Sequence, residues 1–146
     1  MEKLIYILQT YSGMLLESLG QTMLLTLLSL IFAFIIGLVF GLMNVGKNRA
    51  LNFIGTFYVD AVRGVPLIVL AYFIYFGVPA AIKAAGFTDF KLTALQAGTI
   101  ALSMNAGAYM AEIFRAGIQS VDKGQMEAAR SLGLGYGKAM QKVVLP

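Results

Sequence analysis

The sequence predicts an all-α integral membrane protein with about three transmembrane helices and a cytoplasmic helical elbow. Of its 146 residues, 59% are hydrophobic and only 12% are charged, whereas soluble domains carry roughly 25% charged residues. The mean hydropathy of +0.80 agrees with that composition. Long uncharged stretches recur along the chain, and basic residues gather between and after them. Together these features predict one membrane domain over residues 1–146.

The composition also excludes several kinds of chemistry. The chain has no cysteine and no histidine, so disulfides, thiolate metal sites and imidazole acid–base catalysis are ruled out, and no metal site is expected. The net charge of +4 comes from dispersed residues. It is therefore interpreted as loop charge, and no nucleic-acid partner is expected. A membrane enzyme is disfavoured, because no serine nucleophile motif lies near Lys83 or Lys91.

The first elements are an interfacial helix and a transmembrane span. Residues 1–21 mix charged and apolar residues, which favours a short helix at the membrane surface over a cleaved signal peptide. Residues 22–45 contain no charge, and about 20 apolar residues suffice to cross a bilayer. Gly37 and Gly41 in this span either permit close helix packing or are incidental.

Two further spans are predicted after the polar break at residues 46–52. The second covers residues 53–82 and is expected to bend at Pro66. After another break at residues 83–91, the third span covers residues 92–114 and is less apolar than the first. Polar side chains within a membrane usually face the bundle interior or a water-filled path.

The third span supplies the candidate solute path, which consists of Gln96, Ser103, Asn105, Glu112 and Arg115. Glu112 and Arg115 lie three residues apart and therefore share a helix face. They could bind the charged ends of an amino acid or form a structural ion pair at the edge of the span. The same two interpretations apply to Asp60 and Arg63.

The distribution of basic residues predicts the orientation. Lys47 and Arg49 lie in the loop at 46–52, and five basic residues lie in the tail at 115–146. The positive-inside rule places both segments in the cytoplasm. The N-terminus and the loop at 83–91 are then expected outside.

The tail is predicted to form the cytoplasmic elbow. Asp122 and Gln125 fit a capping box that opens a helix, and Gly133 is expected to end it. A second helical stretch, about residues 136–144, stops before Pro146. The elbow is either a docking surface for a partner protein or an amphipathic loop on the lipid headgroups.

The tail resembles the EAA motif of bacterial ABC importer permeases, which is EAA, three residues, G, nine residues and I-x-L-P. The matching residues here are Glu127, Ala128, Ala129, Gly133, Val143, Leu145 and Pro146, with valine in place of isoleucine. Residues 58–77 and 105–133 are similar to the polar amino acid uptake permeases. That group commonly has RGTPLLVQ where this chain has Val65 and Leu70 in place of threonine and glutamine.

The resemblance implies the transmembrane domain of a type I ABC importer in the bacterial cytoplasmic (inner) membrane, translocating a polar amino acid. It implies three protein partners besides the lipid bilayer: an ABC ATPase subunit, a second permease subunit of the same or a sister chain, and an extracytoplasmic solute-binding protein. The implied ATPase-docking residues are Glu127, Ala128, Ala129, Gly133, Leu145 and Pro146. The chain lacks a GxxxxGK[ST] loop, so it is expected to be no enzyme and to bind no cofactor, with ATP and Mg used by the partner ATPase.

Members of this family continue beyond the I-x-L-P element with further spans. The resemblance therefore implies a C-terminally truncated, incomplete transmembrane domain that does not transport alone. The alternative from another class is a small membrane scaffold protein that binds a cytosolic partner without transport.

Overall fold

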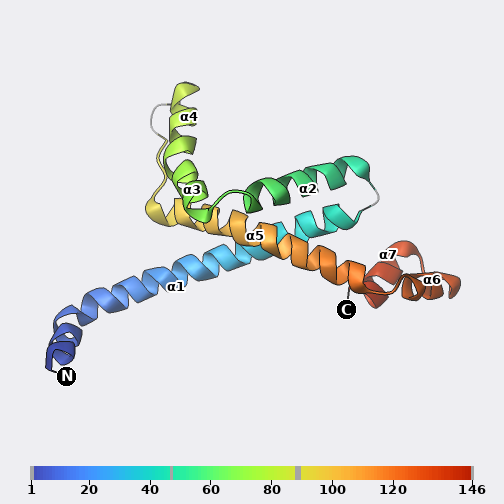
Figure 1. Ribbon diagram of the computed structural model, residues 1–146, viewed down its shortest axis with the longest axis horizontal. Helices are drawn as coiled ribbons and strands as arrows, with labels where there is room; N and C mark the ends of the chain where they lie inside the picture. Colours follow the sequence, from blue (N-terminus) through green and yellow to red (C-terminus); the bar gives the residue numbers. More distant parts are fainter. Residues whose placement is uncertain (1, 47, 88–89, 146) are drawn as a thin grey trace.

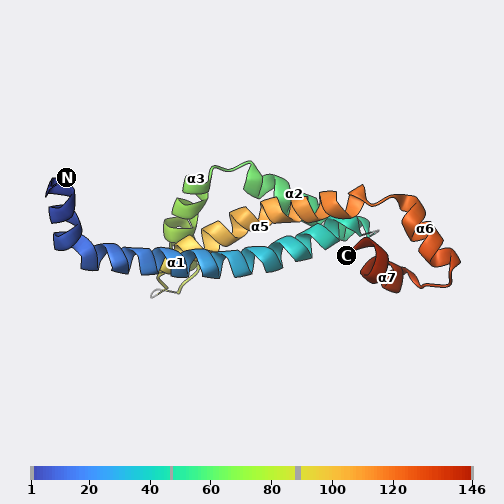
Figure 2. The same cartoon turned by 90° about the horizontal axis from the view of Figure 1, so that it is seen from below.

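The computed structural model describes residues 2–46, 48–87 and 90–145, and every element within these ranges is helical. Helix α1 (Glu2–Val45) is continuous, and its first turns bend away from the remainder (Figure 2). The expected division into an interfacial helix at 1–21 and a span at 22–45 is therefore replaced by one helix. The physical reason is that this segment contains no proline, and Thr22 and Thr26 bond back to carbonyl oxygens one turn earlier, each at 2.8 Å.

The predicted span at 53–82 is divided in the structure. Helix α2 (Arg49–Arg63) ends before Pro66, and the chain then forms α3 (Leu67–Tyr72), a π-helical turn η1 (Phe73–Gly77) and α4 (Val78–Ala84). Proline lacks an N–H and disfavours helical conformation in the residue before it, so the helix breaks where a bend was expected. As a result α2 lies beside α5, α3 contacts the first part of α5, and α4 projects away from it (Figure 1).

Helix α5 (Ala94–Ser120) contains most of the predicted third span and extends beyond its expected end at residue 114. It begins with a capping box that was not predicted from the sequence. The Gln96 N–H donates to Thr93 Oγ1 at 3.2 Å, and the Thr93 N–H donates to Gln96 Oε1 at 2.9 Å. The Gln96 side chain, expected in a solute path, therefore stabilises the helix start.

The tail forms α6 (Lys123–Ser131), α7 (Tyr136–Ala139) and a π-helical turn η2 (Met140–Val144). These elements fold into an elbow at the C-terminal end of α5, near the end of α1 and the start of α2 (Figures 1 and 2). The elbow, the end of α1 and the start of α2 therefore share one end of the molecule.

The all-α fold class is confirmed, with a difference in the spans. Among the described residues, two stretches are long and apolar enough to cross a membrane, Thr10–Val45 and Leu67–Ala84. Helix α5, which holds most of the predicted span at 92–114, is long enough to cross a membrane but less apolar than these two stretches. Its polar side chains lower its hydropathy.

The most extensive helix–helix contact lies between α1 and α5, and a cluster of buried hydrophobic residues from α2, α3 and η1 packs on α5 as well. A buried stripe follows one face of α1 at helical spacing and consists of Ser29, Ala33, Gly37, Gly41 and Asn44. A Cβ added to Gly37 would lie 2.5 Å from Met110 Cβ, and one added to Gly41 would lie 2.9 Å from Phe114 Cβ. Both glycines therefore serve close helix packing, which resolves the alternative left open by the sequence.

Ser103 belongs to the same contact. It is 3% exposed, and its Oγ lies 2.6 Å from the Thr99 carbonyl oxygen and 3.3 Å from the Ser29 carbonyl oxygen. This hydroxyl therefore bonds within α5 and across to α1. The structure places it at a helix–helix contact.

Thr93→Ala is expected to destabilise the start of α5 by about 1 kcal/mol. The substitution removes Thr93 Oγ1, which accepts the hydrogen bond from the Gln96 N–H. Amide hydrogen exchange in the first turn of α5 should rise. Thr26→Ala is the matched control, since its hydroxyl bonds to a carbonyl inside a continuous helix. Equal exchange in the two variants would contradict the capping role.

Candidate functional site

The elbow begins at Asp122, as the sequence predicted, but with a different cap. Asp122 Oδ1 accepts from the Gly124 N–H at 2.6 Å, and the Gln125 N–H donates to the Asp122 carbonyl oxygen at 3.0 Å. The predicted capping box would have the Asp122 side chain accept from Gln125. Asp122 therefore acts as a simple N-cap and still fixes the start of α6.

Gly133 ends α6 in a Schellman motif. Its φ is +85°, its N–H donates to the Arg130 carbonyl oxygen at 3.0 Å, and the Leu134 N–H donates to that of Ala129 at 3.1 Å. These bonds satisfy carbonyl groups at the helix end, and the left-handed conformation favours glycine. The motif glycine therefore sets the direction in which the second arm of the elbow leaves α6.

The predicted docking residues differ in exposure. Glu127 and Ala128 are exposed on α6, whereas Ala129 is 5% exposed and buried inside the elbow. Leu145 remains half-exposed, and Pro146 lies outside the described residues. A hollow of about 670 Å³ separates the elbow from the ends of α1 and α5, and Glu127 contributes to its lining. The exposed surface thus presents Glu127 and Ala128, while Ala129 supports it from beneath.

Gly133→Ala is expected to cost about 1–2 kcal/mol, because an alanine in the left-handed region brings its Cβ against the following carbonyl oxygen. We expect faster proteolysis between α6 and α7 in the membrane-embedded protein. Gly135→Ala is the matched control, since Gly135 has φ −63° and nothing within 4 Å of an added Cβ. The same proteolysis rate in both variants would contradict the need for a positive φ.

A polar pocket of about 350 Å³ lies between the end of α1, one face of α2 and the second half of α5. Its lining includes both of the charged pairs that the sequence placed three residues apart. The full lining is Asn44, Asn52, Thr56, Val59, Asp60, Arg63, Glu112, Arg115 and Gln119. The neutral residues Asn52 and Thr56 of α2 were missed, although together with Arg63 they recur at the period of a helix face.

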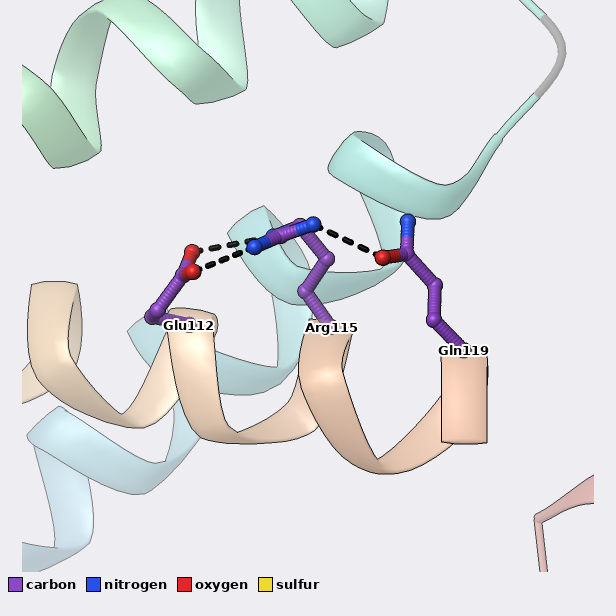
Figure 3. A network of polar contacts seen from close by, with 3 residues as sticks. All are labelled: Glu112, Arg115 and Gln119. Atoms are coloured by element: carbon purple, nitrogen blue, oxygen red, sulfur yellow. Dashed lines mark hydrogen bonds and ion pairs between the residues drawn. The ribbon is translucent and has the colours of Figure 1, made fainter. Parts of the chain in front are cut away.

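Glu112, Arg115 and Gln119 form a connected network along α5 (Figure 3). Arg115 Nε donates to Glu112 Oε2 at 3.0 Å, Arg115 Nη2 bonds to Glu112 Oε1, and Arg115 Nη1 donates to Gln119 Oε1 at 2.7 Å. The guanidinium therefore uses both of its outer edges within its own helix. This is the geometry of the structural ion pair, the second of the two interpretations left open above.

The remaining solute-path candidates lie elsewhere. Asn105 is half-buried, and neither it nor Gln96 or Ser103 lines the polar pocket. The structure thus brings Glu112 and Arg115 together and leaves the other three apart from them. Asp60 and Arg63 join the pocket from α2 instead.

Comparison with known proteins supports a membrane transport component. Residues 33–146 match the family model described as binding-protein-dependent transport system inner membrane component. Two Bacillus subtilis proteins are each 39% identical: the probable glutamine ABC transporter permease protein GlnM over 92% of this chain, and the arginine transport system permease protein ArtQ over 90%. The chain spans 59% and 58% of their respective lengths.

The fold is also similar to a solved structure. The crystal structure of an amino acid ABC transporter with histidines matches with a TM-score of 0.81 and 36% identity. The match covers 95% of this chain and 62% of that one.

Proposed function

The chain belongs to the family of binding-protein-dependent transport system inner membrane components, and from that premise we propose that it serves an ATP-driven importer of polar amino acids. In this role the chain forms part of the solute path, while a separate ATPase subunit hydrolyses ATP. A second permease subunit and an extracytoplasmic solute-binding protein complete the assembly. The elbow lies in the cytoplasm and the N-terminus outside.

The observation that carries this proposal is the geometry of the elbow. Glu127 and Ala128 are exposed on α6, and Gly133 adopts the positive φ that turns the chain into the second arm. These are residues of the EAA motif, and α6 is anchored by caps at both ends. A capped, exposed helix at the end of a long membrane helix can transmit a rigid-body movement of a docked partner.

The polar pocket supports the solute path in the same proposal. It opens beside the C-terminal half of α5, the helix that continues into the elbow. A movement of the elbow would therefore displace one wall of the pocket against α1 and α2. Glu112 and Arg115 form that wall and hold its shape through their ion pair.

The test is reconstitution of the natural gene product with its ATPase and solute-binding protein in proteoliposomes. We expect uptake of a labelled polar amino acid that requires ATP on the elbow side and the binding protein on the other side. An ATPase that co-purifies with the chain while no amino acid is taken up would contradict import and favour the membrane scaffold alternative.

A further inference from the structure

We propose that the polar pocket selects amino acids that carry no net charge, with Asp60 and Arg63 binding the α-ammonium and α-carboxylate groups. This inference rests on the proposed function, because it places the solute in this pocket. It names a substrate class, a zwitterion with an uncharged hydrogen-bonding side chain. It also assigns solute binding to α2, which carries one of the two charged pairs for which the sequence left solute binding and a structural ion pair open.

The charges that line the polar pocket balance each other. The pocket is lined by two carboxylates and two guanidinium groups, those of Asp60, Glu112, Arg63 and Arg115. Arg115 is bound by two contacts to Glu112 and a third to Gln119, so these charges neutralise each other. Within residues 2–46, 48–87 and 90–145, no side-chain hydrogen bond or ion pair engages Asp60 or Arg63. Arg63 also interacts electrostatically with Glu112, but the hydrogen-bonding groups of one carboxylate and one guanidinium remain for a ligand.

The positions of Asp60 and Arg63 suit the two charged groups of an amino acid. Arg63 Cζ lies 5.1 Å from the centre of the Tyr109 ring, so the guanidinium face is covered while its N–H edges stay available. Those edges match a planar carboxylate. Asp60 lies three residues earlier on the same helix, and side chains at this spacing are neighbours on a helix surface. The pair can thus reach both charged groups of one amino acid.

The remainder of the pocket wall is mostly polar but uncharged. It contains amide and hydroxyl groups from Asn52, Thr56 and Gln119, which can bond to an uncharged polar side chain. Asn52 Nδ2 already donates to the Asn44 carbonyl oxygen and Arg115 donates to Gln119 Oε1, each at 2.7 Å. The side-chain oxygen of Asn52, the Thr56 hydroxyl and the Gln119 amide N–H groups therefore remain for a ligand. A ligand with a third charge would find no free opposite charge here, and an unpaired charge away from water is costly. The volume of about 350 Å³ suits a small solute.

The test measures binding to the permease–ATPase complex in nanodiscs without the solute-binding protein, so that only the pocket discriminates. Equilibrium dialysis would compare two nearly isosteric pairs, glutamine with glutamate and citrulline with arginine. We expect the neutral member of each pair to bind at least about tenfold more tightly, since a hydrogen bond to a charged group commonly changes affinity by that factor or more. Equal binding within either pair overturns the proposal, as does no binding to a complex that transports.

Variants then assign the selectivity to residues. Asp60→Asn should raise glutamate binding relative to glutamine, and Arg63→Gln should raise arginine binding relative to citrulline. Arg49→Gln is the matched control, because Arg49 lies on the same helix outside this pocket. Asp60→Glu and Arg63→Lys keep each charge and should keep the selectivity, which separates charge from folding effects. Ratios that change no more than in Arg49→Gln overturn the assignment.

Uptake by the complete system is measured in parallel. Absence of ATP-dependent uptake of any amino acid would contradict the proposed function itself. Uptake that persists without selectivity in the pocket would contradict only this inference.

Discussion

Gly37→Ala is expected to destabilise the contact between α1 and α5 by about 1–3 kcal/mol, the usual cost of overpacking a close contact. The added Cβ would lie 2.5 Å from Met110 Cβ and 3.2 Å from the Gly107 carbonyl oxygen. Neither atom is the far end of a flexible side chain, so the helices must separate. The measurement is the midpoint of thermal unfolding of the permease in detergent micelles.

Gly20→Ala on the same helix is the matched control. Nothing lies within 4 Å of a Cβ added to Gly20, and alanine is the better helix former by about 0.5–1 kcal/mol. The two substitutions are chemically identical, yet their effects should have opposite signs. If Gly37→Ala raised the midpoint as Gly20→Ala does, the close approach of α1 and α5 would be wrong.

The sequence predicted the elements better than their junctions. Composition and uncharged stretches identified the all-α membrane class because burial in lipid requires apolar side chains over whole turns. The break at Pro66 was expected as a bend, since sequence cannot decide whether neighbouring contacts hold a proline-containing helix together. The end of the third span was placed too early because α5 continues beyond the membrane-like composition to Ser120.

In the candidate site, too, local features were predicted from the sequence, whereas contacts between helices were not. Asp122 and Gly133 predicted an elbow because capping and turn preferences act over a few residues. The polar pocket depends on contacts among three helices, so the sequence supplied two charged pairs without showing that they share one cavity. It also could not show that Arg115 is fully engaged by Glu112 and Gln119, because side-chain partners follow from packing. Gln96 is the opposite case, because its hydrogen-bond partner Thr93 lies only three residues away in the sequence.

Glu127→Lys is expected to abolish uptake while leaving the protein in the membrane, if the elbow docks on an ATPase as proposed. Glu127 is exposed on α6, the first arm of the elbow. Reversing a charge inside a docked interface commonly costs about 2–5 kcal/mol, which weakens binding well beyond tenfold. ATP hydrolysis by the ATPase should continue without stimulation by the loaded solute-binding protein. Uptake and hydrolysis would be measured in the same proteoliposomes.

Two further variants separate the causes. Glu127→Gln keeps the shape and removes the charge, so it should retain more coupling than Glu127→Lys if charge reversal is the dominant effect. Lys83→Glu reverses a charge on an exposed residue at the end of α4, away from the elbow, and should leave coupling unchanged. If Glu127→Lys transported at the rate of Lys83→Glu, the first arm would not contact the ATPase through this residue. Docking would then have to involve the second arm, where Leu145 remains half-exposed.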